Sequence, residues 1–121
     1  MPFELRQTGG FPVVVGPAEI DISNSGELRT ALLRAQALGP VVVVDMSGTE
    51  FCDSSGLSVL VRALRRAQSE GGEVRLVVCT AAVLRILAVT GIGSIFGLFS
   101  SLAEALAKPP PRLTAACDPA P

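Results

Sequence analysis

The chain has 121 residues, 49% of them apolar, which is enough for one domain with a hydrophobic core that needs neither metal nor disulfide. Ten basic residues oppose eleven acidic ones, so no net field favours nucleic acid or an anionic membrane. The absence of histidine, with only three scattered cysteines, leaves too few ligands for a structural zinc site.

Local patterns predict strands and helices that alternate after an initial hairpin. In chain order these are a hairpin with strands at 3–8 and 12–15, a helix at 21–37 and a strand at 41–44. A second helix follows, with helical spacing over 57–64 and an end at Gly71-Gly72. A strand at 74–79, a helix at 81–90, a short strand at 95–99 and a short helix that opens at Ser101 and stops at Pro109 complete the domain. The alternation predicts an α/β fold, a single domain whose mixed sheet of four to five strands packs with about four helices. Residues 1–107 form this domain, and the Pro/Ala-rich segment 108–121, which lacks any period, is expected to be a disordered tail.

Residues that begin or end helices support these bounds. Asn24 and Glu27 have the spacing of a capping pair, and so do Ser101 and Glu104. Gly91 is expected to stop the helix at 81–90. Apolar residues recur at helical spacing between 57 and 64, and three arginines stand among and after them: Arg62, Arg65 and Arg66. These arginines suit a solvated helix face or, as an alternative, a patch that contacts a partner.

Residues 86–103 carry no charge over a length at the lower limit for a membrane span. Three glycines interrupt the segment, and no Trp or Tyr marks a membrane interface. We therefore interpret it as the end of one helix, a short strand and the start of the next helix rather than as a membrane span.

The cysteines are Cys52, Cys79 and Cys117, an odd number in a chain without the charged and apolar regions of a signal peptide. This argues against a secreted disulfide scaffold and favours a cytoplasmic protein. Cys52 and Cys79 are expected to be buried and reduced, and Cys117 lies in the predicted tail.

Polar residues concentrate in one loop, between the strand at 41–44 and the helix that follows. The loop ends in Asp53-Ser54-Ser55-Gly56, and loops at the carboxyl ends of strands are where sites form in α/β folds. Either Ser54 or Ser55 is expected to cap the helix with its hydroxyl, which alone would account for the motif. The same helix start, with its free amides and positive dipole end, also suits a phosphate on serine.

The loop resembles the signature of the STAS anti-sigma factor antagonist family, with Asp45-x-Ser47 followed by Phe51-x-Asp53-Ser54-Ser55-Gly56-Leu57. Ala18-Glu19-Ile20-Asp21 is similar to the family's Gly-Glu-Leu-Asp, with Ala at the first position. Further matches follow in the family's order up to about residue 107: Gly71-Gly72 before 74–78, Leu87-x-x-Thr90-Gly91-Ile92, and Ser101-Leu102-x-Glu104-Ala105-Leu106.

The resemblance implies a partner-switching function. In this family the unmodified antagonist binds an anti-sigma factor, which is also a serine kinase of the GHKL type, and the sigma factor is released. Phosphorylation of the serine after the Asp, here Ser54, loosens the complex, and a PP2C-type phosphatase removes the phosphate. The resemblance also implies that Asp21, Asp53 and Ser55 border the site, and that a side chain at Gly56 would crowd an approaching kinase.

Other functions fit the sequence less well. Without histidine, Ser54 and Cys52 lack the base of a Ser-His-Asp or Cys-His site, and no enzyme activity is expected. Asp45 ends a strand as the acceptor of a receiver domain would, but the acidic pair and the lysine of that fold are missing. No Walker-type loop is present, so ATP would come from a partner and no cofactor is expected. The alternative function is an accessory STAS subunit of a lipid or anion transporter, without a phosphoswitch.

Overall fold

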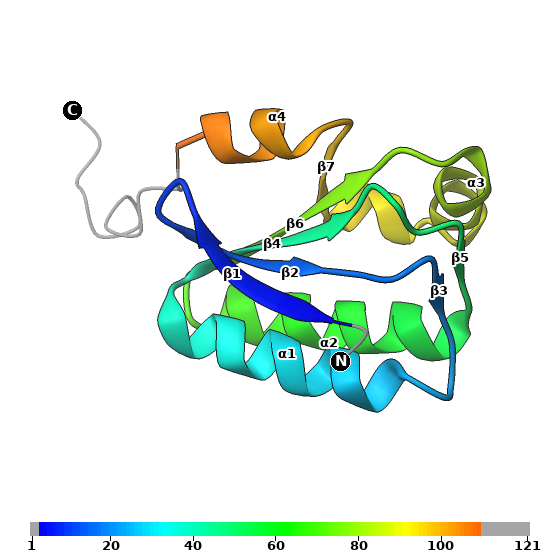
Figure 1. Ribbon diagram of the computed structural model, residues 1–121, viewed down its shortest axis with the longest axis horizontal. Coiled ribbons are helices and arrows are strands. Elements are labelled where there is room, and N and C mark those ends of the chain that lie inside the picture. Colours follow the sequence, from blue (N-terminus) through cyan, green and yellow to red (C-terminus); the bar gives the residue numbers. More distant parts are fainter. Residues whose placement is uncertain (1–2, 110–121) are drawn as a thin grey trace.

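The computed structural model describes residues 3–109, which contain seven strands, four α-helices and one 3-10 helix (Figure 1). The elements are β1 (Glu4–Thr8), β2 (Phe11–Val15), β3 (Glu19–Ile20), α1 (Ser25–Leu38), β4 (Val41–Met46), β5 (Phe51–Cys52), α2 (Ser54–Ser69), β6 (Glu73–Val78), α3 (Ala81–Thr90), η1 (Ile92–Ile95), β7 (Gly97–Phe99) and α4 (Leu102–Ala107). The predicted α/β class is confirmed.

Five strands form a mixed sheet in the order β1-β2-β4-β6-β7. The hairpin β1–β2 is antiparallel, and the other neighbours are parallel, as expected for strands joined by helical crossovers. A second sheet, which the sequence did not predict, pairs β3 with β5 in parallel. Its strands have two residues each, which is too short to show any hydrophobic period.

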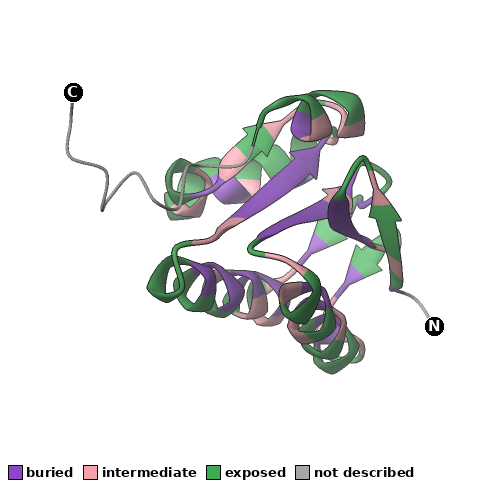
Figure 2. Cartoon of the chain, turned by 90° about the vertical axis from the view of Figure 1, so that its left-hand side faces the viewer, coloured by how far each residue is buried: buried purple, intermediate pink, exposed green. Residues whose placement is uncertain are grey.

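The helices form layers on the two faces of the five-stranded sheet (Figure 1). The long helices α1 and α2 pack side by side under one face, and the short helix α4 packs on β4, β6 and β7 at the other. Strand β4 is covered on both faces, which explains its continuously apolar sequence. Val42 and Val44 belong to the core under α1 and α2, and Val41 and Val43 belong to the core on the opposite face. Figure 2 shows these central strands buried along their length.

A buried arginine lies on the α4 side of the sheet. Arg75 is in β6 and has no solvent exposure. Its Nη1 donates hydrogen bonds to the carbonyls of Ala105 at 2.6 Å and Lys108 at 2.7 Å, and its Nη2 donates to Pro109 at 3.0 Å. Nη2 also forms an ion pair with Glu73 at 3.1 Å. The guanidinium therefore satisfies carbonyls at the end of α4, which have no partner within that helix.

Two predicted helix starts had different outcomes. Helix α1 begins at Ser25 rather than near residue 21, and the predicted capping by Asn24 is wrong. The Asn24 side chain instead accepts a hydrogen bond from the Asp21 N–H and donates one to the Glu19 carbonyl, so it stabilises the turn that precedes α1. The second capping prediction is confirmed, because the Ser101 hydroxyl accepts from the Glu104 N–H at 3.1 Å.

The uncharged segment 86–103 is divided among α3, η1, β7 and α4, which confirms its interpretation as several short elements. No helix within residues 3–109 is both long and apolar enough to cross a membrane. Gly91 ends α3 in the left-handed conformation with φ of 75°, as predicted. The strand expected at 95–99 is shorter, because residues 92–95 form η1 and only Gly97–Phe99 pairs with β6. The predicted disorder of the tail concerns mainly residues 110–121, which lie outside the described part of the chain.

Candidate functional site

The candidate site lies where the chain leaves the carboxyl ends of β2 and β4. Thr49, fully buried, connects the loops there, because its hydroxyl donates to the Pro17 carbonyl at 2.8 Å. The Thr80 hydroxyl donates to the Thr49 carbonyl at 2.8 Å and ties in the start of α3. Three loops that are distant in sequence are thus fastened to one another, which gives the site a rigid support.

The small sheet brings together two carboxylates that the sequence placed beside the site. Ile20 pairs with Cys52, and the Asp53 N–H donates to the Ile20 carbonyl at 3.0 Å. Asp21 and Asp53 therefore follow neighbouring strands at the same edge. The Asp21 carboxylate accepts from the Ser23 N–H at 2.9 Å and from the Ser23 hydroxyl, so it shapes the turn that leads into α1.

Asp53 caps helix α2. Its Oδ1 accepts from the N–H groups of Ser55 at 2.9 Å and Gly56 at 3.2 Å, and from the Ser55 hydroxyl at 2.5 Å. The prediction that Ser54 or Ser55 would cap the helix is therefore wrong. Asp53 has the extended backbone of an N-cap residue, which points its carboxylate at the free amides of the first turn.

The same contacts lower the pKa of the Asp53 carboxyl below its usual range. The hydrogen bond from the Ser55 hydroxyl contributes most to this lowering, and burial opposes it as the second-largest effect. The backbone N–H groups of Gly56, Ser55 and Ile22 each lower the pKa by less. Asp53 therefore carries a full negative charge near neutral pH, directly before Ser54.

The two serines of the motif differ in what their hydroxyls do. Ser54 is the first residue of α2 and is exposed, and among residues 3–109 its side chain makes no hydrogen bond. Ser55 is partly buried, and its hydroxyl is used in the bond to Asp53. Only the Ser54 hydroxyl is thus both accessible and uncommitted.

Gly56 faces the small sheet rather than the solvent. A Cβ at this position would lie 2.6 Å from Cγ2 of Ile20 and 2.8 Å from Sγ of Cys52, which is closer than real Cβ atoms approach. The glycine is buried and lets the first turn of α2 pack on β3 and β5. The reason expected for it, space for an approaching kinase, is therefore wrong.

The two cysteines within residues 3–109 have different environments. Cys52 is buried as predicted, and burial, with a smaller effect of the Asp53 charge, raises the pKa of its thiol to about 11. Cys79 is exposed, so its predicted burial is wrong. It follows the last residue of β6, beyond the covered part of the strand, and its Sγ donates to the Ser100 carbonyl at 3.1 Å.

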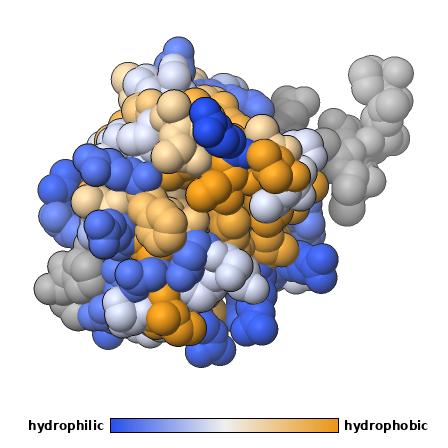
Figure 3. Space-filling view, turned by 90° about the vertical axis from the view of Figure 1, so that its right-hand side faces the viewer, coloured by the Kyte–Doolittle hydropathy of each residue, from blue (hydrophilic) through white to orange (hydrophobic). Residues whose placement is uncertain are grey.

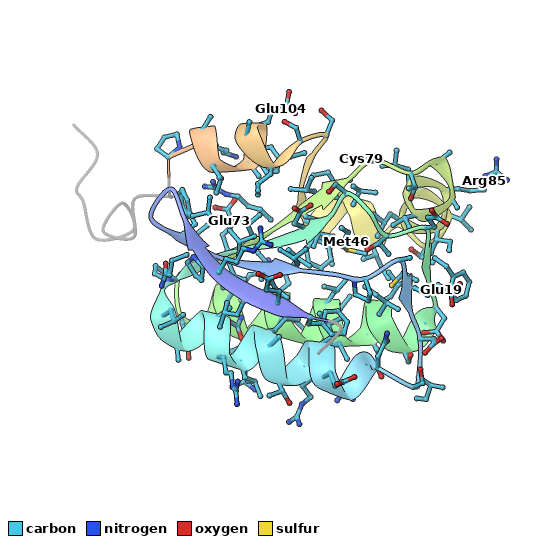
Figure 4. The ribbon with its side chains drawn as sticks, viewed as in Figure 1. Glu19, Met46, Glu73, Cys79, Arg85 and Glu104 are labelled. Atoms are coloured by element: carbon cyan, nitrogen blue, oxygen red, sulfur yellow. The ribbon has the colours of Figure 1, made fainter. Side chains whose placement is uncertain are left out.

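The surface around Ser54 combines apolar and acidic side chains. Ile22 and Phe51 expose 79% and 46% of their surface, and Glu19 and Glu50 are also exposed. Figure 4 shows Glu19 on β3 at the end of the molecule where Arg85 extends from α3. Figure 3 shows this end of the molecule, where a hydrophobic area is bordered by hydrophilic residues. Such a surface is suited to contact with another protein. Within residues 3–109, no group of three potential ligands lies together to hold a metal ion.

Comparison with known proteins identifies the fold and the family. The STAS domain family matches residues 2–105.

The chain belongs to the STAS domain family.

Among solved structures, this STAS domain is similar to an anti-sigma factor antagonist from Mycobacterium paratuberculosis, with 30% identity, a TM-score of 0.76 and coverage of 86% of this chain and 89% of the other. It is also similar to the Bacillus cell fate determinant SpoIIAA in its phosphorylated form, with 20% identity, a TM-score of 0.67 and coverage of 86% and 96%. The third is the murine anion transporter Slc26a9, with 20% identity, a TM-score of 0.67 and coverage of 84% and 18%. The last two show a shared fold alone, and the predicted family is confirmed by the first and by the family match.

Proposed function

We propose that this STAS domain is a bacterial, cytoplasmic anti-sigma factor antagonist that phosphorylation of Ser54 switches off. The unmodified form binds an anti-sigma factor that is a GHKL-type serine kinase, and a PP2C-type phosphatase restores it. The chain acts as a binding partner and phosphate acceptor rather than as an enzyme. The similarity to the mycobacterial antagonist supports the class of partner, and SpoIIAA is a protein of the same fold known in a phosphorylated form.

The observation that carries the proposal is the difference between the two serines. Ser54 presents a free hydroxyl at the exposed start of α2, whereas the Ser55 hydroxyl is bonded to Asp53. A kinase needs an accessible hydroxyl, so Ser54 meets this condition and Ser55 does not.

The cap explains how a phosphate would act. Asp53 already occupies the N–H groups of Ser55 and Gly56, which a phosphate at a helix start would otherwise bind. A phosphate on Ser54 would therefore extend toward solvent beside a carboxylate and add about −1.5 to −2 charges there. It would change the contact surface near Ile22 and Phe51 without requiring the domain to refold.

The test uses the anti-sigma factor that co-purifies with the native protein. Incubation with this kinase and ATP should modify Ser54, as located by mass spectrometry. Ser54→Asp should bind the anti-sigma factor at least about 30-fold more weakly than wild type, because a disrupted charged contact at an interface centre costs about 2–5 kcal/mol. Ser54→Ala should bind and resist inactivation by ATP.

Ser69→Asp is the matched control, because it places the same charge at another exposed serine, at the opposite end of α2. Its affinity should stay near the wild-type value. Phosphate found on Ser55 alone, or equal affinities of Ser54→Asp and wild type, would contradict the proposal. Recovery of a transporter subunit in place of a kinase would favour the accessory-subunit alternative.

A further inference from the structure

A groove runs along the solvent side of the seam between α1 and α2, away from the Ser54 surface. It has a volume of about 270 Å³ and is lined by two helical stripes. The residues that matter here are Arg29, Leu33 and Gln36 on α1, and Val59, Arg62 and Arg66 on α2. Both sets follow the spacing of one helix face, so each helix presents a continuous wall.

The floor of this groove is held in place by a contact between the helices. The side-chain amide of Gln36 donates to the Ala63 carbonyl at 2.8 Å and so bridges α1 to α2. Beneath this bridge, Leu32 and Ala63 are buried in the main core. The floor of the groove is therefore preformed, and a ligand would not have to pay for ordering it.

The arginines on the rims of the groove form no ion pair within the described part of the domain. The ion pairs within residues 3–109 are Arg6–Glu4 and Arg75–Glu73, so none of the three groove arginines has one. Several of the chain's acidic residues, including Glu19, Glu50 and Asp53, lie instead at the Ser54 end. The groove thus combines a floor of apolar side chains and the Gln36 amide with guanidinium groups on both sides that form no ion pair.

We propose that this groove docks an amphipathic, acidic helix of a partner protein. A groove between two helices accepts a third helix, whose apolar side chains would contact Leu33 and Val59. Arg62 and Arg66 are four residues apart, which is about 6 Å along the axis, and carboxylates four residues apart on the incoming helix match that separation. Arg29, on the α1 rim, would contact a third carboxylate of the incoming helix.

This docking site goes beyond the proposed function and is independent of it. Ser54 and Arg62 are separated by eight residues of α2, about 12 Å of helix rise, whereas charges in physiological salt are screened over about 8 Å. A phosphate on Ser54 should therefore have little effect on helix binding in the groove. The protein would hold two contacts at once, one switched and one constitutive.

The test uses a fluorescein-labelled synthetic helix of about 15 residues, with two glutamates four residues apart and leucines on the same face. Binding to the full chain is measured by fluorescence anisotropy, and the contact surface is mapped by amide chemical shifts in NMR. Arg62→Glu/Arg66→Glu should weaken binding at least about tenfold. Arg34→Glu/Arg65→Glu is the matched control, because it makes the same changes at exposed arginines of α1 and α2 outside the groove, and it should change affinity less than about twofold.

A charge-reversed peptide with lysines in place of the glutamates should prefer Arg62→Glu/Arg66→Glu over wild type, which shows that charge rather than a folding defect controls binding. Ser54→Asp should bind the acidic peptide with wild-type affinity, whatever the fate of the phosphoswitch. Four results would overturn the proposal: no binding to wild type at about 1 mM peptide, equal losses in the two double variants, shifts centred on the Ser54 surface, or a homodimer that Arg62→Glu/Arg66→Glu dissociates.

Discussion

The two faces of the five-stranded sheet are closed by different means. On one face, helices of 14 and 16 residues cover a core of apolar side chains that includes Val42, Val44 and Leu60. On the other face, α4 has six residues, of which Ala105 alone is buried. The guanidinium of Arg75 lies between this helix and the sheet, 5.1 Å from the ring centre of Phe11 and 5.9 Å from that of Phe99.

The comparison shows how a short helix can be held where apolar burial is scarce. A helix of six residues is unstable alone and leaves most of its carbonyls without partners. Arg75 donates to carbonyls of Ala105, Lys108 and Pro109 and stacks near two aromatic rings, so one side chain supplies both polar and packing contacts. The long helices need no such contact, because each buries a whole apolar stripe.

Loss of Arg75 should have the largest effect on this arrangement. We expect Arg75→Met to lower the free energy of unfolding by about 3 kcal/mol, because one buried and two partly buried carbonyls lose a charged donor. In Arg75→Met, the α4 amides should exchange with solvent faster than in wild type, whereas exchange in α1 and α2 should change less. Hydrogen exchange measures the rates. Arg6→Met, at an exposed arginine of β1, should leave exchange unchanged. Uniform faster exchange in all four helices would contradict a local role.

A methyl group at Gly56 tests how tightly the α1–α2 face is packed at the site. We expect Gly56→Ala to destabilise by about 1–2 kcal/mol, because overpacking against Ile20 and Cys52 outweighs the higher helix propensity of alanine. Gly26→Ala, in α1 with no atom within 4 Å of the added carbon, should instead stabilise by up to about 1 kcal/mol. Urea denaturation measures both, and the same sign for both variants would refute the packing argument.

The Asp53 cap should make the start of α2 sensitive to acid. A carboxyl whose pKa is lowered in the folded state stabilises the protein above its unfolded pKa, near 3.8, and this stabilisation is lost as the pH falls through the folded value. The thermal unfolding midpoint of wild type should therefore be higher than that of Asp53→Asn at pH 7, and this difference in midpoint should shrink below about pH 4. A difference that stays constant down to pH 2 would show that the charge of Asp53 does not contribute.

The two thiols within residues 3–109 should distinguish the covered and uncovered parts of the fold, with little effect on stability. Iodoacetamide at neutral pH should modify Cys79 in the native protein, and Cys52 only after denaturation, because burial and its raised pKa keep the Cys52 thiol protonated. Peptide mapping by mass spectrometry distinguishes the sites. Rapid native modification of Cys52 would mean that β5 opens readily.

The sequence by itself determined much of this protein. Hydrophobic period and turn residues located the hairpin, the elements α1, β4 and α2, and the helix that ends at Gly91. These signals are local, because they depend only on neighbouring residues. The motif around Ser54 indicated the family, which the match over residues 2–105 confirms. The role of Ser54 itself stays a prediction.

Only the tertiary structure decided what depends on residues distant in the chain. The pairing of β3 with β5 joins segments about 30 residues apart, and with two residues each they carry no periodic signal. The same pairing explains Gly56, whose neighbours Ile20 and Cys52 come from these strands. Arg75 is a charged residue within the strand predicted at 74–79, which is otherwise apolar, and the carbonyls that allow its burial belong to residues 105–109. A buried charge is stable only where distant groups meet it, and no local pattern reveals that meeting.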